Sequence, residues 1–191
     1  MKEGLIKDTY ETALKEIQTI TTVSYILAVG IGMLFTFQKY SEFGINIFDF
    51  ADVFDFLIAP FSDFKIFIFI IISVTFTYLL FRLDFFWRSK FPKSYSKMAF
   101  GWDKKEWYNT FRYLSFGLLF VFYLYISADT YGEVSKAEIL NQPPIEIRFT
   151  DNEIKKGKII GKTKEVIFLI RGEEVEAIPI TSVVKEFEIR K

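Results

Sequence analysis

The sequence predicts an integral membrane α-helical protein with three transmembrane helices, an interfacial helix and a small C-terminal all-β domain. The main observation is that three apolar runs, 21–37, 66–81 and 113–128, contain no Asp, Glu, Lys or Arg. A helix rises about 1.5 Å per residue, so each run covers roughly 25 Å and, with its flanking residues, crosses a hydrocarbon core of about 30 Å. The second observation is that helical periodicity gives way to alternation towards the C-terminus. We therefore expect spans at about 21–37, 64–82 and 111–128.

The composition limits the chemistry that the chain can perform. It has 191 residues, a formal net charge of zero, no cysteine and no histidine. Disulfides, thiolate nucleophiles, imidazole bases and the usual zinc ligands are therefore absent. The spans also lack the charges and prolines that active transporters need at membrane depth. We expect no enzyme, with no catalytic residue, metal site or cofactor, and the neutral charge balance gives no reason to expect a nucleic-acid partner.

Residues 1–20 are predicted to form an amphipathic N-terminal helix, because apolar side chains recur there at spacings of three and four. Such a helix is expected to lie against the membrane surface or the inner loop of the protein, and the alternative is a helix that docks a partner. Both charge signs precede the first apolar run, so we expect no cleavable signal peptide and the first span to remain as an anchor.

Small and hydroxyl residues suggest roles within the spans. The first span carries small residues every four positions, a helix-packing stripe that lets backbones approach closely within one chain or between copies in a homo-oligomer: Ser24, Ala28, Gly32 and Thr36. In the second span Ser73 and Thr77 share a helix face. Their hydroxyls are expected to bond carbonyls of their own helix, with pore lining as the alternative.

The stretch between the first two spans combines phenylalanines with three regularly spaced carboxylates. Asp49, Asp52 and Asp55 cover about 120° of one face of a predicted helix at 45–59, which Pro60 is expected to end. Unpaired carboxylates would be costly in hydrocarbon, so the helix is expected to lie in the membrane interface. The alternative is a re-entrant helix whose carboxylates attract cations to a wet vestibule.

The loop at 82–112 is basic and aromatic, whereas the first loop is nearly free of cations. The positive-inside rule then places this loop and the N-terminus in the cytoplasm, and an odd number of spans places the C-terminal domain outside, in a bacterial cytoplasmic membrane. Anionic headgroups or a soluble cytoplasmic protein are the expected contacts of its cations, and the candidate docking residues are Arg88, Lys90, Lys93, Lys97, Lys104 and Lys105.

The C-terminal part is divided into a linker at 129–142 and a β domain at 143–191. Alternating apolar residues predict five short strands, and the pairs 151–152, 156–157 and 171–172 read as turn signals. This tail resembles SH3-like barrels. A domain of this size is marginal by itself, so docking onto its own oligomer or the membrane is expected.

Two function classes remain. The first is a non-enzymatic oligomeric scaffold or sensor that couples the lipid bilayer to a soluble partner, and the alternative is a pore-forming or cation-channel protein. In size and arrangement the chain resembles the small polytopic membrane subunits of bacterial phage-defence systems, the Kiwa-like membrane subunits among them. That resemblance implies sensing of envelope disturbance, recruitment or restraint of a soluble partner, and a role in antiviral defence.

Overall fold

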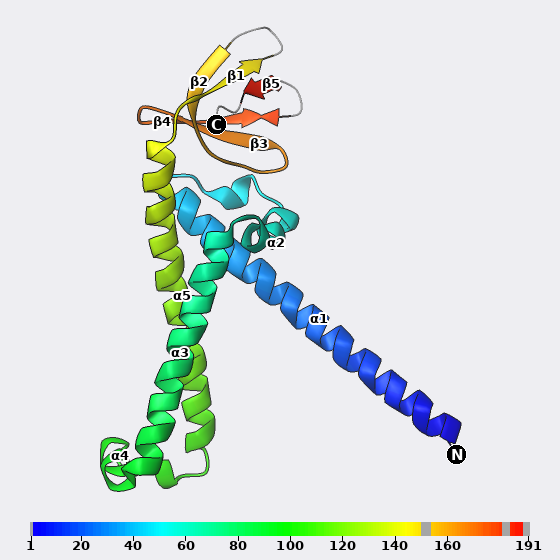
Figure 1. The fold of residues 1–191 in the computed structure, drawn as a ribbon, viewed down its shortest axis with the longest axis vertical. Helices are drawn as coiled ribbons and strands as arrows, with labels where there is room; N and C mark the ends of the chain where they lie inside the picture. Colours follow the sequence, from blue (N-terminus) through cyan, green and yellow to red (C-terminus); the bar gives the residue numbers. More distant parts are fainter. Residues whose placement is uncertain (1, 150–153, 181–183, 189–191) are drawn as a thin grey trace. The chain divides into compact units, whose positions relative to one another are not determined.

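The chain forms two compact units in a computed structural model that describes residues 2–149, 154–180 and 184–188, with side chains from Leu14 to Phe149 and from Ile154 to Ile180 (Figure 1). Unit 1 comprises residues up to Asp63 together with the chain from Gly132 onward. Unit 2 is the intervening segment, Phe64–Tyr131.

Three helices in the described part of the chain are long and apolar enough to cross a membrane. They are α1 (Lys2–Ser41), α3 (Phe64–Lys90) and α5 (Tyr108–Asn141), with candidate spans at Leu14–Ser41, Phe64–Lys90 and Tyr108–Asn141. The predicted N-terminal helix is continuous with the first span, since no proline interrupts α1. Most large apolar side chains on these helices are exposed, as expected of helices that meet lipid or further protein.

The short elements differ from their predicted bounds. The predicted helix at 45–59 is instead a 3-10 turn, η1 (Ile47–Asp49), followed by α2 (Val53–Ser62). Pro60 lies inside α2 rather than ending it. The predicted linker at 129–142 is helical as far as Asn141, because no proline follows the start of α5 until Pro143 and Pro144.

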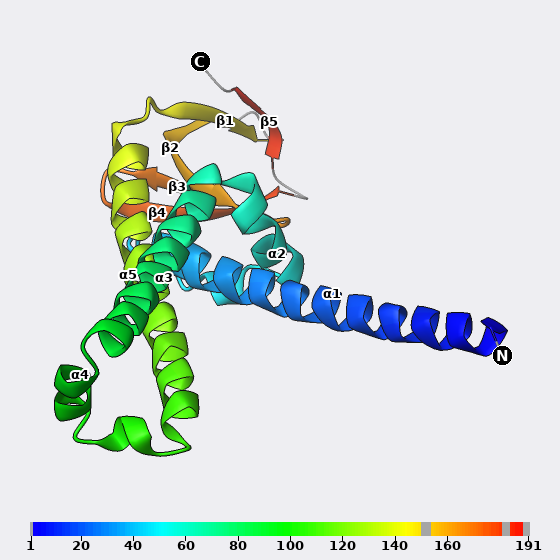
Figure 2. The same cartoon turned by 60° about the horizontal axis from the view of Figure 1, so that its bottom comes forward.

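The basic loop is partly ordered into helix. In Figure 2, α4 (Pro92–Met98) and η2 (Trp102–Lys104) connect the end of α3 to the start of α5. Gly101, the N-cap residue of η2, is in the left-handed conformation, with φ of 75°, which glycine adopts without steric cost. The loop therefore has a defined structure of its own within unit 2.

Five antiparallel strands form one sheet in the order β4-β3-β2-β1-β5. They are β1 (Ile145–Phe149), β2 (Ile154–Lys162), β3 (Val166–Arg171), β4 (Glu174–Pro179) and β5 (Val184–Glu188). In the described residues β4 pairs only with β3, and β5 only with β1, so the sheet is not closed. The small all-β domain is confirmed, whereas its closure into an SH3-like barrel is not.

Strand β3, which lies between β4 and β2, is buried on both faces, and each face belongs to a different apolar cluster. Ile167 and Leu169 pack with side chains of β1 and β4 on one face. Phe168, on the other face, packs against helical residues of unit 1. Alternate residues of a strand point to opposite faces, so the continuous apolar run 166–170 is what a strand covered on both sides requires.

Candidate functional site

A backbone contact joins α1 to α2 in unit 1. A Cβ atom added to Gly32 would overlap the carbonyl oxygen of Phe56, so only glycine fits there. The same carbonyl lacks its usual donor four residues later, because Pro60 has no N–H. Gly32, Phe56 and Pro60 are all buried, and together they let α2 lie directly against α1.

This contact identifies what the Gly32 part of the small-residue stripe packs against. Gly32 faces α2 of the same chain, and Thr36 and Ala28 are half-buried. Ser24 is exposed in unit 1. Gly32 therefore packs within the chain, and the contact between copies stays a prediction for the Ser24 end of the stripe.

The three carboxylates have local structural roles. Asp52 is the N-cap of α2: its side chain accepts hydrogen bonds from the backbone N–H groups of Phe54 and Asp55, while the Asp55 carboxylate accepts from the N–H of Asp52. This capping box satisfies donors that the first turn of a helix leaves free. Asp49 accepts a 3.0 Å hydrogen bond from the side chain of Asn46. Attraction of cations by these residues stays a prediction.

The ends of α1 and α5 meet at the sheet. Tyr40 near the end of α1 and Ile139 near the end of α5 share one buried cluster with Ile160 and Phe168 of the sheet, and the rings of Tyr40 and Phe168 lie edge to face at 5.2 Å. The first loop contributes Ile47 to the same cluster.

Polar and glycine contacts tie the two helix ends together. Lys136 of α5 donates to the backbone carbonyl of Glu42 at 2.6 Å and pairs with its carboxylate at 3.3 Å. A Cβ added to Gly132 would come within 2.9 Å of the Gln38 carbonyl oxygen, so α5 approaches the α1 backbone closely. The first loop and the C-terminal sheet thus lie together at one end of unit 1.

Unit 2 joins α3 to α5 through side chains. The Ser73 hydroxyl lies 2.8 Å from that of Ser127 and donates to the carbonyl of Phe69 at 3.0 Å. Ser73 is buried between the helices, where its hydroxyl contacts protein rather than an aqueous path within unit 2. The Thr77 hydroxyl is buried without a hydrogen-bond partner in the described residues.

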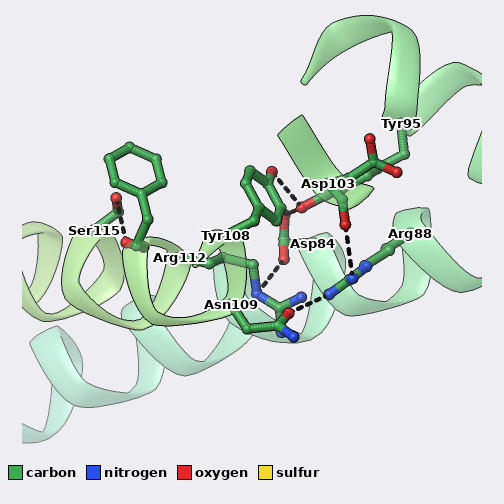
Figure 3. A network of polar contacts seen from close by, with 9 residues as sticks. Asp84, Arg88, Tyr95, Asp103, Tyr108, Asn109, Arg112 and Ser115 are labelled. Carbon is green, nitrogen blue, oxygen red and sulfur yellow. Dashed lines mark hydrogen bonds and ion pairs between the residues drawn. The ribbon is translucent and has the colours of Figure 1, made fainter. Parts of the chain in front are cut away.

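At the loop end of unit 2 the helices are joined by an ion pair (Figure 3). Arg112 Nε lies 3.3 Å from Asp84 Oδ2, and the Arg112 side chain is 8% exposed. The guanidinium also lies over the rings of Phe81 and Tyr113, at 5.4 and 5.5 Å. Its Nη1 has no hydrogen-bond partner among the described residues.

Two tyrosines extend this pair into a chain of hydrogen bonds. Tyr95 of α4 donates to Asp84 Oδ1 at 3.0 Å, so the Tyr108 hydroxyl, also at 3.0 Å, acts as donor to Tyr95. Burial, aided by these two partners, raises the pKa of the Tyr95 phenol above its usual range. Arg88 adds a second tie by donating to Asn109 at 2.7 Å and to the Asp103 carbonyl (Figure 3).

The six candidate docking cations fall into three groups. Arg88 is engaged in the network just described. Lys90 and Lys105 are exposed. Lys93, Lys97 and Lys104 line an open pocket of about 520 Å³.

Sequence reasoning missed the residues that organise unit 2. The segment 82–112 was interpreted only as a basic and aromatic loop, and Asp84, Tyr95 and Arg112 within it were given no roles. The available signal was a single carboxylate eleven residues before a tyrosine, which is too unspecific to predict a pair. In unit 1, the tie between Lys136 and Glu42 was likewise invisible, because it joins residues 94 positions apart.

No family model, curated protein or solved structure matches this chain. In the described residues, no group of three or more His, Cys, Asp or Glu side chains is placed to hold a metal ion. Two features remain for a functional interpretation. They are the contact of the helix ends with the sheet in unit 1, and the polar contacts that connect α3, α4 and α5 in unit 2.

Proposed function

We propose that the chain is a non-enzymatic, oligomeric membrane scaffold or sensor that couples the bilayer to a soluble partner. The observation that supports this best is the shared core of unit 1. One buried cluster contains side chains of α1, η1, α2, α5 and the sheet. Close-packed interiors transmit displacement rather than absorb it, so a force on the sheet moves the ends of α1 and α5.

The other end of α5 is the end that we propose to face the soluble partner. α5 is one uninterrupted helix from Tyr108, beside the basic loop, to Asn141, beside the sheet. At about 1.5 Å per residue, its 34 residues extend roughly 50 Å, which exceeds the hydrocarbon thickness. A continuous helix of this length is a suitable element for relaying a change from one side of the membrane to the other.

We further propose that the soluble partner is cytoplasmic and that the pair acts in bacterial antiviral defence, as the resemblance in layout to Kiwa-like membrane subunits implies. The test is co-expression of the chain with the protein encoded beside it, followed by phage challenge. Protection that requires both proteins supports this role. Protection by neither, or by the neighbour alone, contradicts it.

A cation channel is the second candidate and has less support. Asp52 and Asp55 cap α2, and Ser73 bonds Ser127, so these side chains are used in packing. Planar-bilayer recording separates the two functions. Cation currents that fall when Asp49, Asp52 and Asp55 are changed to Asn favour the channel, whereas a silent protein that still assembles favours the scaffold.

The absence of cysteine makes the topology directly measurable. Single cysteines at exposed Glu173, in the β3–β4 turn, and at exposed Lys105, in the basic loop, can be labelled with a membrane-impermeant maleimide on intact cells. We expect labelling of Glu173→Cys after outer-membrane permeabilisation and of Lys105→Cys only after lysis. The reverse pattern, or labelling of both from one side, contradicts the proposed orientation.

Assembly is tested at the exposed end of the stripe. Ser24→Leu places a bulky side chain on the proposed contact between copies, and Thr22→Leu makes a matched change at an exposed position off the stripe. We expect Ser24→Leu to lower the oligomer mass in detergent and Thr22→Leu to leave it unchanged. A parent protein that is monomeric in both detergent and nanodiscs contradicts the oligomeric scaffold.

A further inference from the structure

The loop between α3 and α5 carries an apolar row beside a basic pocket. Four exposed aromatic rings follow one another with centroid distances of 5.8, 5.7 and 6.5 Å. From α5 outward they are Phe111, Trp107, Trp102 and Phe100. The row begins two residues before the charge-free run that starts at Tyr113. It thus continues the apolar surface of α5 to the tip of the loop.

The tip of this row is held in an unfavourable conformation. Phe100 has φ of 52° and is 84% exposed. A bulky side chain in the left-handed region is strained, and such strain persists where the surrounding structure imposes it, often at functional sites. Water offers no compensation for a strained and exposed phenylalanine, whereas an apolar environment does.

The pocket next to the tip collects positive charge. Phe100 and Gly101 form part of its wall, and the lining cations are Lys93, Lys97 and Lys104. No described residue pairs with these three ammonium groups in an ion pair or side-chain hydrogen bond. The lining carboxylate, Asp103, accepts a 2.8 Å hydrogen bond from Ser96.

We propose that this loop binds an anionic phospholipid, with the lipid phosphate in the pocket of Lys93, Lys97 and Lys104 and the aromatic row alongside the glycerol and upper acyl region. Three facts point to lipid of the same bilayer rather than a soluble anion: the aromatic row leads from the apolar run to the pocket, tryptophans concentrate at membrane interfaces, and the loop at 82–112 has eight cations against three anions. The inference rests on the proposed membrane placement of α3 and α5.

Lipid contact at the pocket can be read by a single tryptophan. The variant Trp87→Phe/Trp107→Phe retains Trp102 as the only tryptophan and keeps aromatic rings at the other two positions. The full-length protein is placed in nanodiscs with equal mole fractions of phosphatidylglycerol and phosphatidylcholine, and bromine is carried on the acyl chains of one or the other. We expect stronger quenching of Trp102 by brominated phosphatidylglycerol.

Charge variants then test whether the lysines of the pocket cause the preference for phosphatidylglycerol. Changing Lys93, Lys97 and Lys104 to Gln should lower the apparent affinity for phosphatidylglycerol by about fivefold per lysine. The matched control changes three exposed lysines of unit 1 to Gln, Lys156, Lys162 and Lys164, with the same loss of charge and no expected loss of preference. Phe100→Asn, which tolerates the left-handed conformation but lacks the ring, should weaken the quenching by both lipids.

The outcomes separate this inference from the membrane placement itself. Quenching by both lipids without preference overturns the anionic-lipid site and leaves the membrane placement standing, whereas absence of quenching by either contradicts both. A preference that excess inorganic phosphate abolishes identifies a soluble-anion site and also overturns the proposal. An equal loss in the control lysine variant would show that overall charge, rather than the pocket, attracts the lipid.

Discussion

The two units bring helices together in opposite ways. In unit 1, α2 approaches α1 at Gly32, where backbone meets backbone and a single added carbon would collide with Phe56. In unit 2, α3 and α5 are joined by side chains, through the serine pair Ser73 and Ser127 and the ion pair of Asp84 with Arg112. The first joint depends on the absence of a side chain, and the second depends on polar groups.

The two contacts are the two solutions that lipid, the solvent proposed for these helices, leaves open. Lipid gives no hydrophobic reason for apolar helices to associate, so close backbone approach and interhelical hydrogen bonds are the available attractions. Close approach tolerates no added volume but needs no partner group. A polar joint tolerates changes of shape better than the removal of one partner. The following substitutions test this contrast in order of expected effect.

The largest effect is expected at Gly32. In Gly32→Ala the new Cβ meets backbone rather than a movable side chain, so α2 must separate from α1. We expect a loss of about 3 kcal/mol in the free energy of unfolding, the upper range for overpacked sites. Thermal unfolding in detergent, with proteolysis to follow the release of α2, measures it.

The same helix supplies the matched control. Gly30 has no atom within 4 Å of an added Cβ. Gly30→Ala should therefore leave stability unchanged or raise it by up to about 1 kcal/mol through helix propensity. Equal destabilisation by both substitutions would show that glycine flexibility, rather than close approach, is what α1 requires.

The next effect is expected at the ion pair of unit 2. Arg112→Met removes the partner of Asp84, whose side chain is only 22% exposed. Leaving one member of such a pair alone costs more than replacing both, and Tyr95 still donates to the carboxylate, so we expect a loss of about 2 kcal/mol. Thermal unfolding of the full chain in detergent measures this loss.

A double-mutant cycle isolates the interaction between the two charges. Asp84→Asn keeps an acceptor for Tyr95 while removing the charge. The double variant Asp84→Asn/Arg112→Met should be less destabilised than the sum of the single changes. Strict additivity would mean that Arg112 stabilises the hairpin through its stacking on Phe81 and Tyr113 alone.

Sequence patterns predicted the helices and strands that depend only on residues close together in the chain. Charge-free runs gave the three long helices, and alternation gave the strands, because both depend on the polarity of neighbours in the chain. Glycines were interpreted less well. Gly157, read as a turn signal, lies inside β2, where a Cβ would meet Leu169 of the neighbouring strand. Gly172, with φ of 65°, does occupy a turn.

The contacts that hold each unit together were out of reach for a physical reason. A turn glycine and a close-approach glycine have the same local sequence signature, and only the position of a distant segment distinguishes them. The same holds for Pro60, which usually ends a helix but here leaves the Phe56 carbonyl facing Gly32. Residue spacing therefore singled out charged residues as candidate sites, but it could not predict the distant residues with which they pair.

A smaller effect is expected at the cap of α2. Asp52→Ala removes the acceptor for two backbone N–H groups and should cost about 1 kcal/mol. Asp49→Ala is the matched control, since within the described part of the chain that exposed carboxylate accepts only from the Asn46 side chain, and a change within about 0.5 kcal/mol is expected. Thermal unfolding distinguishes the two. A channel vestibule would predict a different pattern: equal effects of both changes on cation current and neither on stability.

The smallest effect is expected at the serine pair. Ser73→Ala deletes the hydrogen bond to Ser127 and should cost about 0.6 kcal/mol, the mean for such bonds between membrane helices. Ser127→Ala should cost a similar amount, and the double variant little more, because both changes remove the same bond. The exposed Thr75 of α3 provides a control whose change to Ala should be nearly neutral. Independent, additive losses at the two serines would mean that each hydroxyl acts on its own helix, and the side-chain joint of unit 2 would then reduce to the ion pair and its tyrosines.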